Sequence, residues 1–205
     1  MSNKPSLFVI AAPSGAGKTT LVKELIKRNP EFKSSISYTT REKRLTEIEG
    51  TDYFFVKTAE FQELKAKGEL LESAFVFDNH YGTSRSQVEQ YFANGHHVIL
   101  EIDWQGAQQV RQAKLDCITI FILPPSLIEL ERRVRKRGTD NDTVIQKRLS
   151  EACGDMSHWD EFDYVIINND LQLAITELTS VFYGQAEANN VRSKSFQKKI
   201  AKIVG

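Results

Sequence analysis

A glycine-rich segment near the start of the chain constrains its fold more than any other feature. It follows an apolar run at residues 7–10, precedes apolar residues at helical spacing, and reads Ala12-Pro13-Ser14-Gly15-Ala16-Gly17-Lys18-Thr19. This order matches the phosphate-loop pattern G-x-x-x-x-G-K-[ST] at every fixed position except the first, where Ala12 replaces glycine. Backbone N–H groups of such a turn meet at a helix N-terminus, where the helix dipole favours an anion. The segment therefore predicts a phosphate-binding loop between a strand and a helix.

Two residues at the end of this loop indicate what it binds. Lys18 is placed to reach the terminal phosphates of a nucleotide, and Thr19 to offer its hydroxyl to Mg²⁺. A turn that needs glycine only for its backbone angles has no need for a Lys-Thr pair. Because alanine adopts positive φ only at a cost, Ala12 is expected to be a small departure from ideal loop geometry.

Composition limits the partners that the chain can attract. With 205 residues, 40% hydrophobic and 26% charged, it can form one substantial core with smaller inserted lobes. Lys plus Arg equals Asp plus Glu at 27 each, so no net charge draws the chain to nucleic acid or to an anionic membrane. Cys117 and Cys153 lack the spacing of a disulfide framework or a metal site, and no apolar stretch approaches the roughly 18 residues of a membrane span. We expect a cytoplasmic protein that binds neither nucleic acid nor membrane.

Apolar runs at residues 7–10, 97–103, 117–123 and 164–168 alternate with helical patterns. This alternation predicts an α/β doubly wound fold whose parallel sheet is covered by helices on both faces. Ligands of such sheets bind at the carboxyl ends of the strands. The second run ends in acids, where phosphate-loop proteins hold Mg²⁺ or its waters, although its last residue, Asp103, can equally be read as the cap of the next helix.

Residues 50–81 contain short strand and helix patterns and are expected to form a small inserted lobe. Arg41 and Arg44, just before it, lie beside hydroxyl residues and suit an oxyanion, although a charged loop alone is usually only solvated. In the run that begins at Leu70, alternation places Glu72 on a mostly apolar face. A carboxylate buried there needs a partner.

The second half of the chain predicts a hinged helical flap. Ser126 and Glu129 are spaced as a capping box for a helix in which Arg133 and Arg137 share one face. Glu129 and Glu131 precede arginines by four residues, so part of this charge is accounted for by surface ion pairs. Residues 138–142 join this helix to another. A last helix is expected from about residue 171 to 188, and the segment after it is polar and basic, with apolar residues too sparse to define a partner.

Taken together, these segments resemble the guanylate kinase family from about residue 7 to 183. The resemblance rests on ordered motifs: the phosphate loop, Ser37-Tyr38-Thr39-Thr40-Arg41 with Arg44, Gly50-x-x-Tyr53-x-Phe55, Glu72, Tyr81-Gly82-Thr83, Ile102-Asp103-x-Gln105-Gly106, Phe121-x-x-Pro124-Pro125-Ser126 and Asn168-x-Asp170. It implies Mg²⁺-dependent transfer of the γ-phosphoryl group of ATP to GMP, giving ADP and GDP. It also implies a core of residues 1–34, 85–130 and 154–188, a GMP-binding lobe at 35–84, a lid at 131–153 and a basic C-terminal tail at 189–205.

The same resemblance assigns roles to individual residues. The acceptor GMP would be held at its phosphate by Arg41, Arg44, Tyr53 and Tyr81, and on its guanine side by Ser37, Glu72, Thr83 and Asp103. The donor nucleotide would contact Ala12, Pro13, Ser14, Gly15, Ala16, Gly17, Lys18, Thr19, Thr20, Arg133 and Asn168. Catalysis would depend on Lys18, Arg41, Arg137 and Arg148. Mg²⁺ would be held by Thr19 and, through water, by Glu101, a position where the family often has Asp.

The hydrogen-bonding groups of guanine are consistent with Glu72 as the residue that recognises the base. Guanine presents two neighbouring donors, N1–H and the N2 amino group, whereas adenine presents an acceptor at N1 and would leave a carboxylate unpaired. Two other readings remain open. One is a kinase of the same architecture with another small phosphate acceptor, which a panel of acceptors would reveal. The other is a non-catalytic guanylate-kinase-like binding module, which would consume no ATP and typically has a degraded phosphate loop.

Overall fold

The computed structural model describes residues 4–76, 78–136 and 142–204, and it confirms the predicted parallel sheet. Every strand pair in this five-stranded sheet is parallel. The order across the sheet is β2 (Phe32–Ser34), β7 (His97–Glu101), β1 (Leu7–Ala11), β8 (Cys117–Leu123) and β9 (Tyr164–Ile167). The central position of β1 brings the loop that follows it beside the acids that follow β7, because both strands point the same way.

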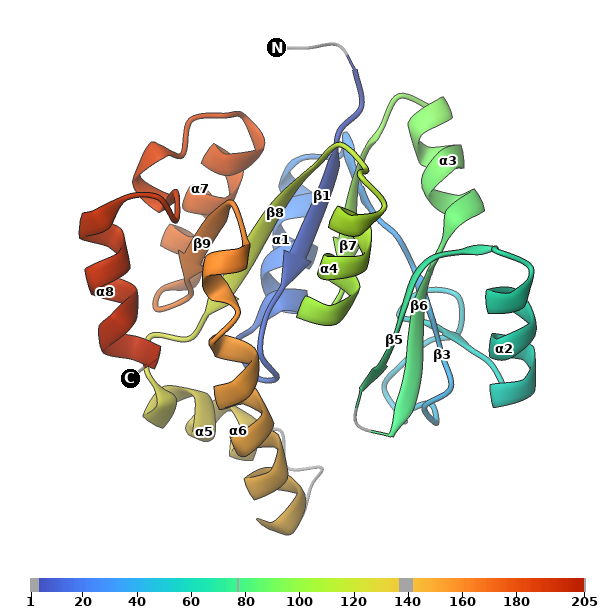
Figure 1. Ribbon diagram of the computed structural model, residues 1–205, viewed down its shortest axis with the longest axis horizontal. Coiled ribbons are helices and arrows are strands. Elements are labelled where there is room, and N and C mark those ends of the chain that lie inside the picture. The colour runs from blue at the N-terminus through green and yellow to red at the C-terminus, as the bar shows by residue number, and fades with distance from the viewer. Residues whose placement is uncertain (1–3, 77, 137–141, 205) are drawn as a thin grey trace.

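Alternation along β1 divides the core between the two faces of the sheet. Leu7, Val9 and Ala11 belong to one buried cluster, and Phe8 and Ile10 belong to the other. The helices that contribute to the first cluster are α3 (Arg85–Ala93), α4 (Trp104–Gln112), α6 (Asp142–Met156) and α8 (Lys194–Val204). The second cluster is covered by α1 (Lys18–Arg28) and α7 (Leu171–Phe182), so α1 and α4 lie on opposite faces in Figure 1.

The predicted inserted lobe forms a separate sheet beside the core (Figure 1). Its strands, in spatial order, are β4 (Phe54–Phe55), β3 (Ser37–Thr39), β6 (Asn79–Ser84) and β5 (Leu70–Val76), with α2 (Thr58–Ala66) packed beside them. In β5 the predicted alternation is confirmed, because Leu70, Glu72 and Ala74 are buried.

Three helices begin at side-chain caps, and two of these caps, Asp103 and Ser126, were predicted. Ser84, Asp103 and Ser126 accept hydrogen bonds from the N–H groups three residues later, at 3.3, 2.7 and 3.2 Å. At Ser84 and Ser126, the side chain three residues later does not bond back to the backbone N–H of the cap, as a full capping box would require. Gln87 Oε1 instead accepts from Ile36 N, and the Glu129 carboxylate binds arginines.

Two helices, α5 (Leu127–Lys136) and α6, form a projection below the sheet in Figure 1. The predicted pairs Glu129–Arg133 and Glu131–Arg135 are present in α5, with N···O distances of 2.7 and 2.8 Å. The predicted connection at residues 138–142 lies outside the described residues, except for Asp142. Among the residues that the structure describes, none of the helices combines the length and apolarity that crossing a bilayer requires.

The C-terminal segment differs from its prediction in two ways. Helix α7 ends at Phe182 rather than near residue 188, because Gly184, at φ 70°, closes it with an N–H bonded to Val181 O. The segment described as a polar and basic tail forms helix α8 instead. Phe196 and Ile200 on this helix are buried in the cluster on the α4 side of the sheet, so its few apolar residues do define a packing face.

The packing of α8 predicts that it contributes to stability. Ile200→Ala is expected to lower the free energy of unfolding by about 2–5 kcal/mol, because it removes fully buried methyl groups and leaves a cavity. Urea unfolding measures this change. The exposed Lys198→Ala in the same helix is the control and should change stability by less than about 0.5 kcal/mol. Equal stability of the two variants would contradict the packing of α8.

Candidate active site

The loop between β1 and α1 has the geometry of a phosphate cradle. Gly15 and Gly17 adopt φ of 93° and 95°, whereas Ala12 does not adopt positive φ, so the alanine in place of the first glycine brings no backbone strain. Gly17 is the N-cap of α1, and no side chain of the described residues caps this helix. Its first N–H groups therefore point toward the loop without a side-chain acceptor, as an anion site requires.

Two of the predicted nucleotide-binding residues, Asn168 and Arg133, form hydrogen bonds to the backbone of this loop. Asn168 Nδ2 donates to Ala16 O at 2.7 Å. Arg133 donates from Nη1 to Ala16 O at 3.3 Å and from Nη2 to Asn168 O at 2.9 Å. A Cβ on Gly17 would lie 2.5 Å from Asn168 Nδ2, so glycine is needed here for close approach as well as for its φ. These contacts connect α5 and the end of β9 to the loop.

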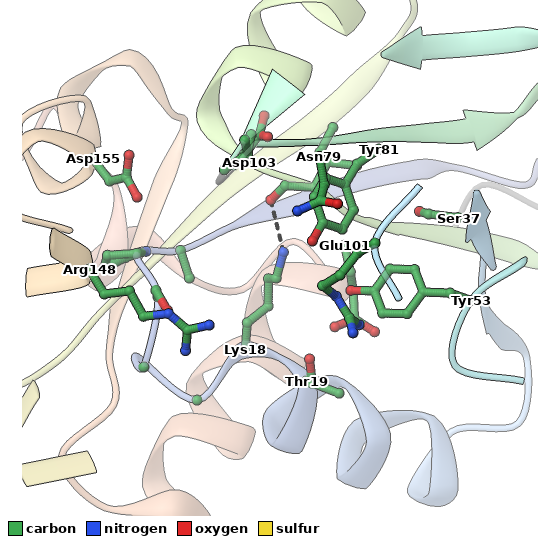
Figure 2. A pocket seen from close by; sticks show the side chains of 18 of the residues that line it. Lys18, Thr19, Ser37, Tyr53, Asn79, Tyr81, Glu101, Asp103, Arg148 and Asp155 are labelled. Atoms are coloured by element: carbon green, nitrogen blue, oxygen red, sulfur yellow. Dashed lines mark hydrogen bonds between the residues drawn. The ribbon is translucent and has the colours of Figure 1, made fainter. Parts of the chain in front are cut away.

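A cavity of about 290 Å³ connects the loop to the inserted lobe (Figure 2). It brings together most of the predicted site residues: Ala12, Pro13, Ser14, Gly15, Gly17, Lys18, Thr19, Ser37, Arg41, Arg44, Tyr53, Glu72, Tyr81, Glu101, Asp103 and Arg148. The predicted residues outside its lining are Ala16, Thr20, Thr83, Arg133 and Asn168. Arg137 lies outside the described residues. The structure thus joins segments that are more than a hundred residues apart in the sequence.

Sequence reasoning missed Asn79 and Asp155, which also line this cavity. Asp155 lies in α6, and its Oδ1 accepts a hydrogen bond from Trp104 Nε1 in α4 at 3.1 Å. Burial raises the pKa of Asp155 to about 6, and the nearby Asp103 adds to the shift. No local pattern marks this residue, because its role in the lining depends on the contact between two helices.

Lys18 extends from the start of α1 into the cavity, where Nζ donates to Ile102 O at 2.9 Å (Figure 2). Burial lowers the pKa of this ammonium group. Four carboxylates oppose that shift, those of Glu101, Asp103, Glu72 and Asp155. The site therefore surrounds one buried cation with acidic groups.

Glu72 is 5% exposed, and its Oε1 accepts a hydrogen bond from Thr83 Oγ1 at 2.7 Å. Burial raises the pKa of Glu72 to about 7, whereas the bond from Thr83 and the charge of Lys18 act in the opposite direction. Gly106 makes room for this carboxylate, because a Cβ there would lie 2.7 Å from Glu72 Oε2. Asp103 caps α4 and also lines the cavity with Glu72. It can therefore be both a helix cap and a residue of the site, the two roles that the sequence left open.

The arginine pair of the lobe is organised by an acid that the sequence analysis did not select. Arg41 Nη2 and Nη1 bind the two carboxylate oxygens of Glu47 at 2.7 and 3.1 Å. Arg44 binds the same carboxylate through its backbone N at 2.8 Å. The Arg41 guanidinium also lies 5.5 Å from the Tyr53 ring centroid. Burial raises the pKa of Tyr53 to about 12, so its hydroxyl remains a hydrogen-bond donor at neutral pH.

Comparisons with known proteins find a matching family, similar sequences and a similar fold. The family model described as guanylate kinase matches residues 4–185. The chain is 55% identical to a guanylate kinase of Aromatoleum aromaticum, with 86% of each chain covered, and 44% identical to that of Escherichia coli, with 97% of each covered. A crystal structure of guanylate kinase from Anaplasma phagocytophilum superposes with a TM-score of 0.74 at 32% identity, covering 90% of this chain and 87% of the other.

The environment of Glu72 predicts an unusual titration. Its carboxyl group should titrate near pH 7, where solvent-exposed glutamates are fully ionised, and ¹³C NMR of the side-chain carboxyl carbon measures this midpoint. Thr83→Val should raise the midpoint further, because the bond from Thr83 stabilises the ionised form. A midpoint near 4.5 in the folded protein would contradict the burial of this group.

Proposed function

Because the chain belongs to the guanylate kinase family, we propose that this cavity transfers the γ-phosphoryl group of ATP to GMP and releases ADP and GDP. The observation that carries the proposal is the meeting of two recognition elements in one cavity. The phosphate loop with Lys18 and the buried Glu72 carboxylate both line it. A cavity so built accepts a nucleotide from each side and brings their phosphates together.

The donor ATP binds at the phosphate loop. The N–H groups at the start of α1 and the Lys18 ammonium face its phosphates, with Thr19 and Thr20 in the first turn. Asn168 and Arg133 maintain the shape of the loop through the Ala16 carbonyl, close to where the adenine end would lie. Arg148, from α6 in the proposed lid, also lines the cavity (Figure 2).

The acceptor GMP binds in the lobe. Its phosphate is held by Arg41, Arg44, Tyr53 and Tyr81, which line the cavity together. Its base is read by Glu72, which accepts from guanine N1–H and from the N2 amino group, with Ser37, Thr83 and Asp103 beside it. Adenine would leave this buried carboxylate unpaired, which costs on the order of 1–3 kcal/mol or more.

In the reaction, an oxygen of the GMP phosphate forms a bond to the γ-phosphorus. The bond from that phosphorus to its bridging oxygen breaks, and the electron pair leaves with ADP. The protein forms no covalent bond, so its contribution is to place two anions in line and to stabilise the charge on the moving group. Lys18, Arg41 and Arg148 supply the cations that line the cavity, and Arg137 would add another from the lid. Closure of the lobe and lid excludes water, which would otherwise hydrolyse ATP.

The residues also fit Mg²⁺. Thr19 and Glu101 both line the cavity and offer oxygen ligands, which Mg²⁺ prefers. Among the described residues no group of three or more His, Cys, Asp or Glu side chains could hold a metal ion alone, so phosphate oxygens and water would complete the coordination. Bound there, Mg²⁺ would neutralise phosphate charge. Glu101 already accepts a hydrogen bond from Ser34 Oγ at 3.2 Å, which directs its carboxylate.

Production of nucleoside diphosphate from ATP, measured with GMP, AMP, UMP and CMP as acceptors, tests the proposal. We expect turnover with GMP and a kcat/KM at least about a hundredfold lower with the other three, because only guanine pairs with the buried carboxylate. Preference for another acceptor would indicate a different kinase of this fold. Absence of ATP consumption with all four would indicate a binding module.

Glu72→Gln tests the base reader directly. Gln replaces one acceptor oxygen with an NH2 donor, so it cannot accept from both guanine N–H groups as well as a carboxylate does, and the ratio of kcat/KM for GMP to that for AMP should fall by about tenfold or more. The KM for ATP should change little, because Glu72 lies in the lobe. An unchanged GMP-to-AMP ratio would remove Glu72 from base recognition.

A further inference from the structure

We propose that Glu47 is a positioning residue for the acceptor phosphate, which fixes the Arg41 guanidinium from behind so that its remaining N–H groups face the cavity. The inference rests on the proposed function, because it concerns the same phosphate subsite. Glu47 forms no part of the cavity lining and therefore acts through Arg41.

The hydrogen bonds at Arg41 show how the guanidinium is held. Its Nη1 donates to Glu47 Oε2 at 3.1 Å and to the Glu42 carbonyl at 2.7 Å, and its Nη2 donates to Glu47 Oε1 at 2.7 Å. These bonds use three of the five N–H groups of arginine. The other two, on Nε and Nη2, form the second edge of the fork, which matches two oxygens of a phosphate group.

Arg41 and Glu47 line two different cavities that adjoin each other. Arg41 lines the cavity that contains Lys18 and Glu72, and Glu47 does not. Glu47 lines a neighbouring cavity against α1, and Arg41 does not. The Glu47 carboxylate binds the edge of the guanidinium formed by Nη1 and Nη2, so the edge formed by Nε and Nη2 is left for the phosphate. The carboxylate does not occupy the place of the phosphate, and GMP can bind without displacing it.

The surroundings of this pair make it rigid. The side chains of Arg41 and Glu47 are 16% and 14% exposed, so water weakens their attraction only in part. Arg41 lies over the Tyr53 and Phe55 rings at 5.5 and 5.7 Å from the centroids. The Arg44 backbone N–H also donates to Glu47, so one carboxylate fixes the path of the loop and the direction of the guanidinium.

The positive charges of Arg41 and Arg44 give a second reason for an acid at Glu47. Arg41 and Arg44 lie near each other in the free protein, and Glu47 contacts the guanidinium groups of both, at 2.7 and 3.5 Å. Hydrogen bonds from these arginines hold the pKa of Glu47 below its usual value, although burial acts against them. The carboxylate thus offsets the repulsion between two cations that must be gathered before the substrate arrives. Ordering them in advance reduces the entropy lost on binding.

The test compares Glu47→Gln with Glu42→Gln. Glu42 is exposed in the same loop and contacts Arg41 only through its carbonyl, so its variant is a matched control for loss of one acidic charge. Isothermal titration calorimetry measures the Kd for GMP and for guanosine, which lacks the phosphate. For Glu47→Gln we expect the Kd for GMP to rise by about tenfold while the Kd for guanosine changes less than twofold, since only the phosphate contact is affected.

Steady-state kinetics should show the same selectivity, with a raised KM for GMP, an unchanged KM for ATP and no change in Glu42→Gln. Weaker binding of guanosine as well as GMP would mean that Glu47 only supports the fold of the lobe, and this would overturn the inference. Tighter GMP binding would also overturn it, because Glu47 would then compete with the phosphate. Unchanged GMP affinity in Glu47→Gln rejects this inference alone, whereas a wild-type chain that binds no GMP would reject the proposed function with it.

Discussion

The buried ammonium group of Lys18 is the interaction on which the rest of the site depends. Burial lowers its pKa, and four carboxylates and the Ile102 carbonyl, 2.9 Å away, act to keep the charge in place. Those carboxylates carry their own cost, since burial raises the pKa of Glu72 to about 7 and that of Asp155 to about 6. In the free site the buried charges are therefore only partly compensated. Binding of two negatively charged nucleotides together with Mg²⁺ would compensate them further.

The fold brings these charges together through strand order. β1 and β7 are parallel neighbours, so the phosphate loop after β1 and the acids at the end of β7 occur at the same edge. The inserted lobe, joined to the core after β2 and before α3, adds Glu72 and the arginines from the opposite side. The contact of Asn168 and Arg133 with Ala16 connects α5 to the loop.

Much of this arrangement could be predicted because it is encoded locally. The apolar runs predicted the strands of the parallel sheet, and the caps Asp103 and Ser126 predicted helix starts. The contributions of Asp155 and Gly106 could not be predicted, since each depends on a contact between elements that pattern alone does not place together. Glu47 was missed because no sequence pattern shows how the loop between β3 and β4 folds back onto Arg41. Helix α8 was missed because Phe196 and Ile200 define a packing face only against a core assembled from distant segments. The position of the inserted lobe relative to the five-stranded sheet depends on tertiary contacts, which no local sequence pattern predicts.

The central claim is that two nucleotides meet in one cavity, one held by backbone N–H groups around Lys18 and the other by the Glu72 carboxylate. A crystal structure of the chain with GMP and a non-hydrolysable ATP analogue tests it most directly. The account predicts guanine N1–H and its amino group within hydrogen-bond distance of Glu72, with the GMP phosphate facing the γ-phosphate beside Lys18. A guanine base bound away from Glu72, with its phosphate still beside Arg41, would contradict it.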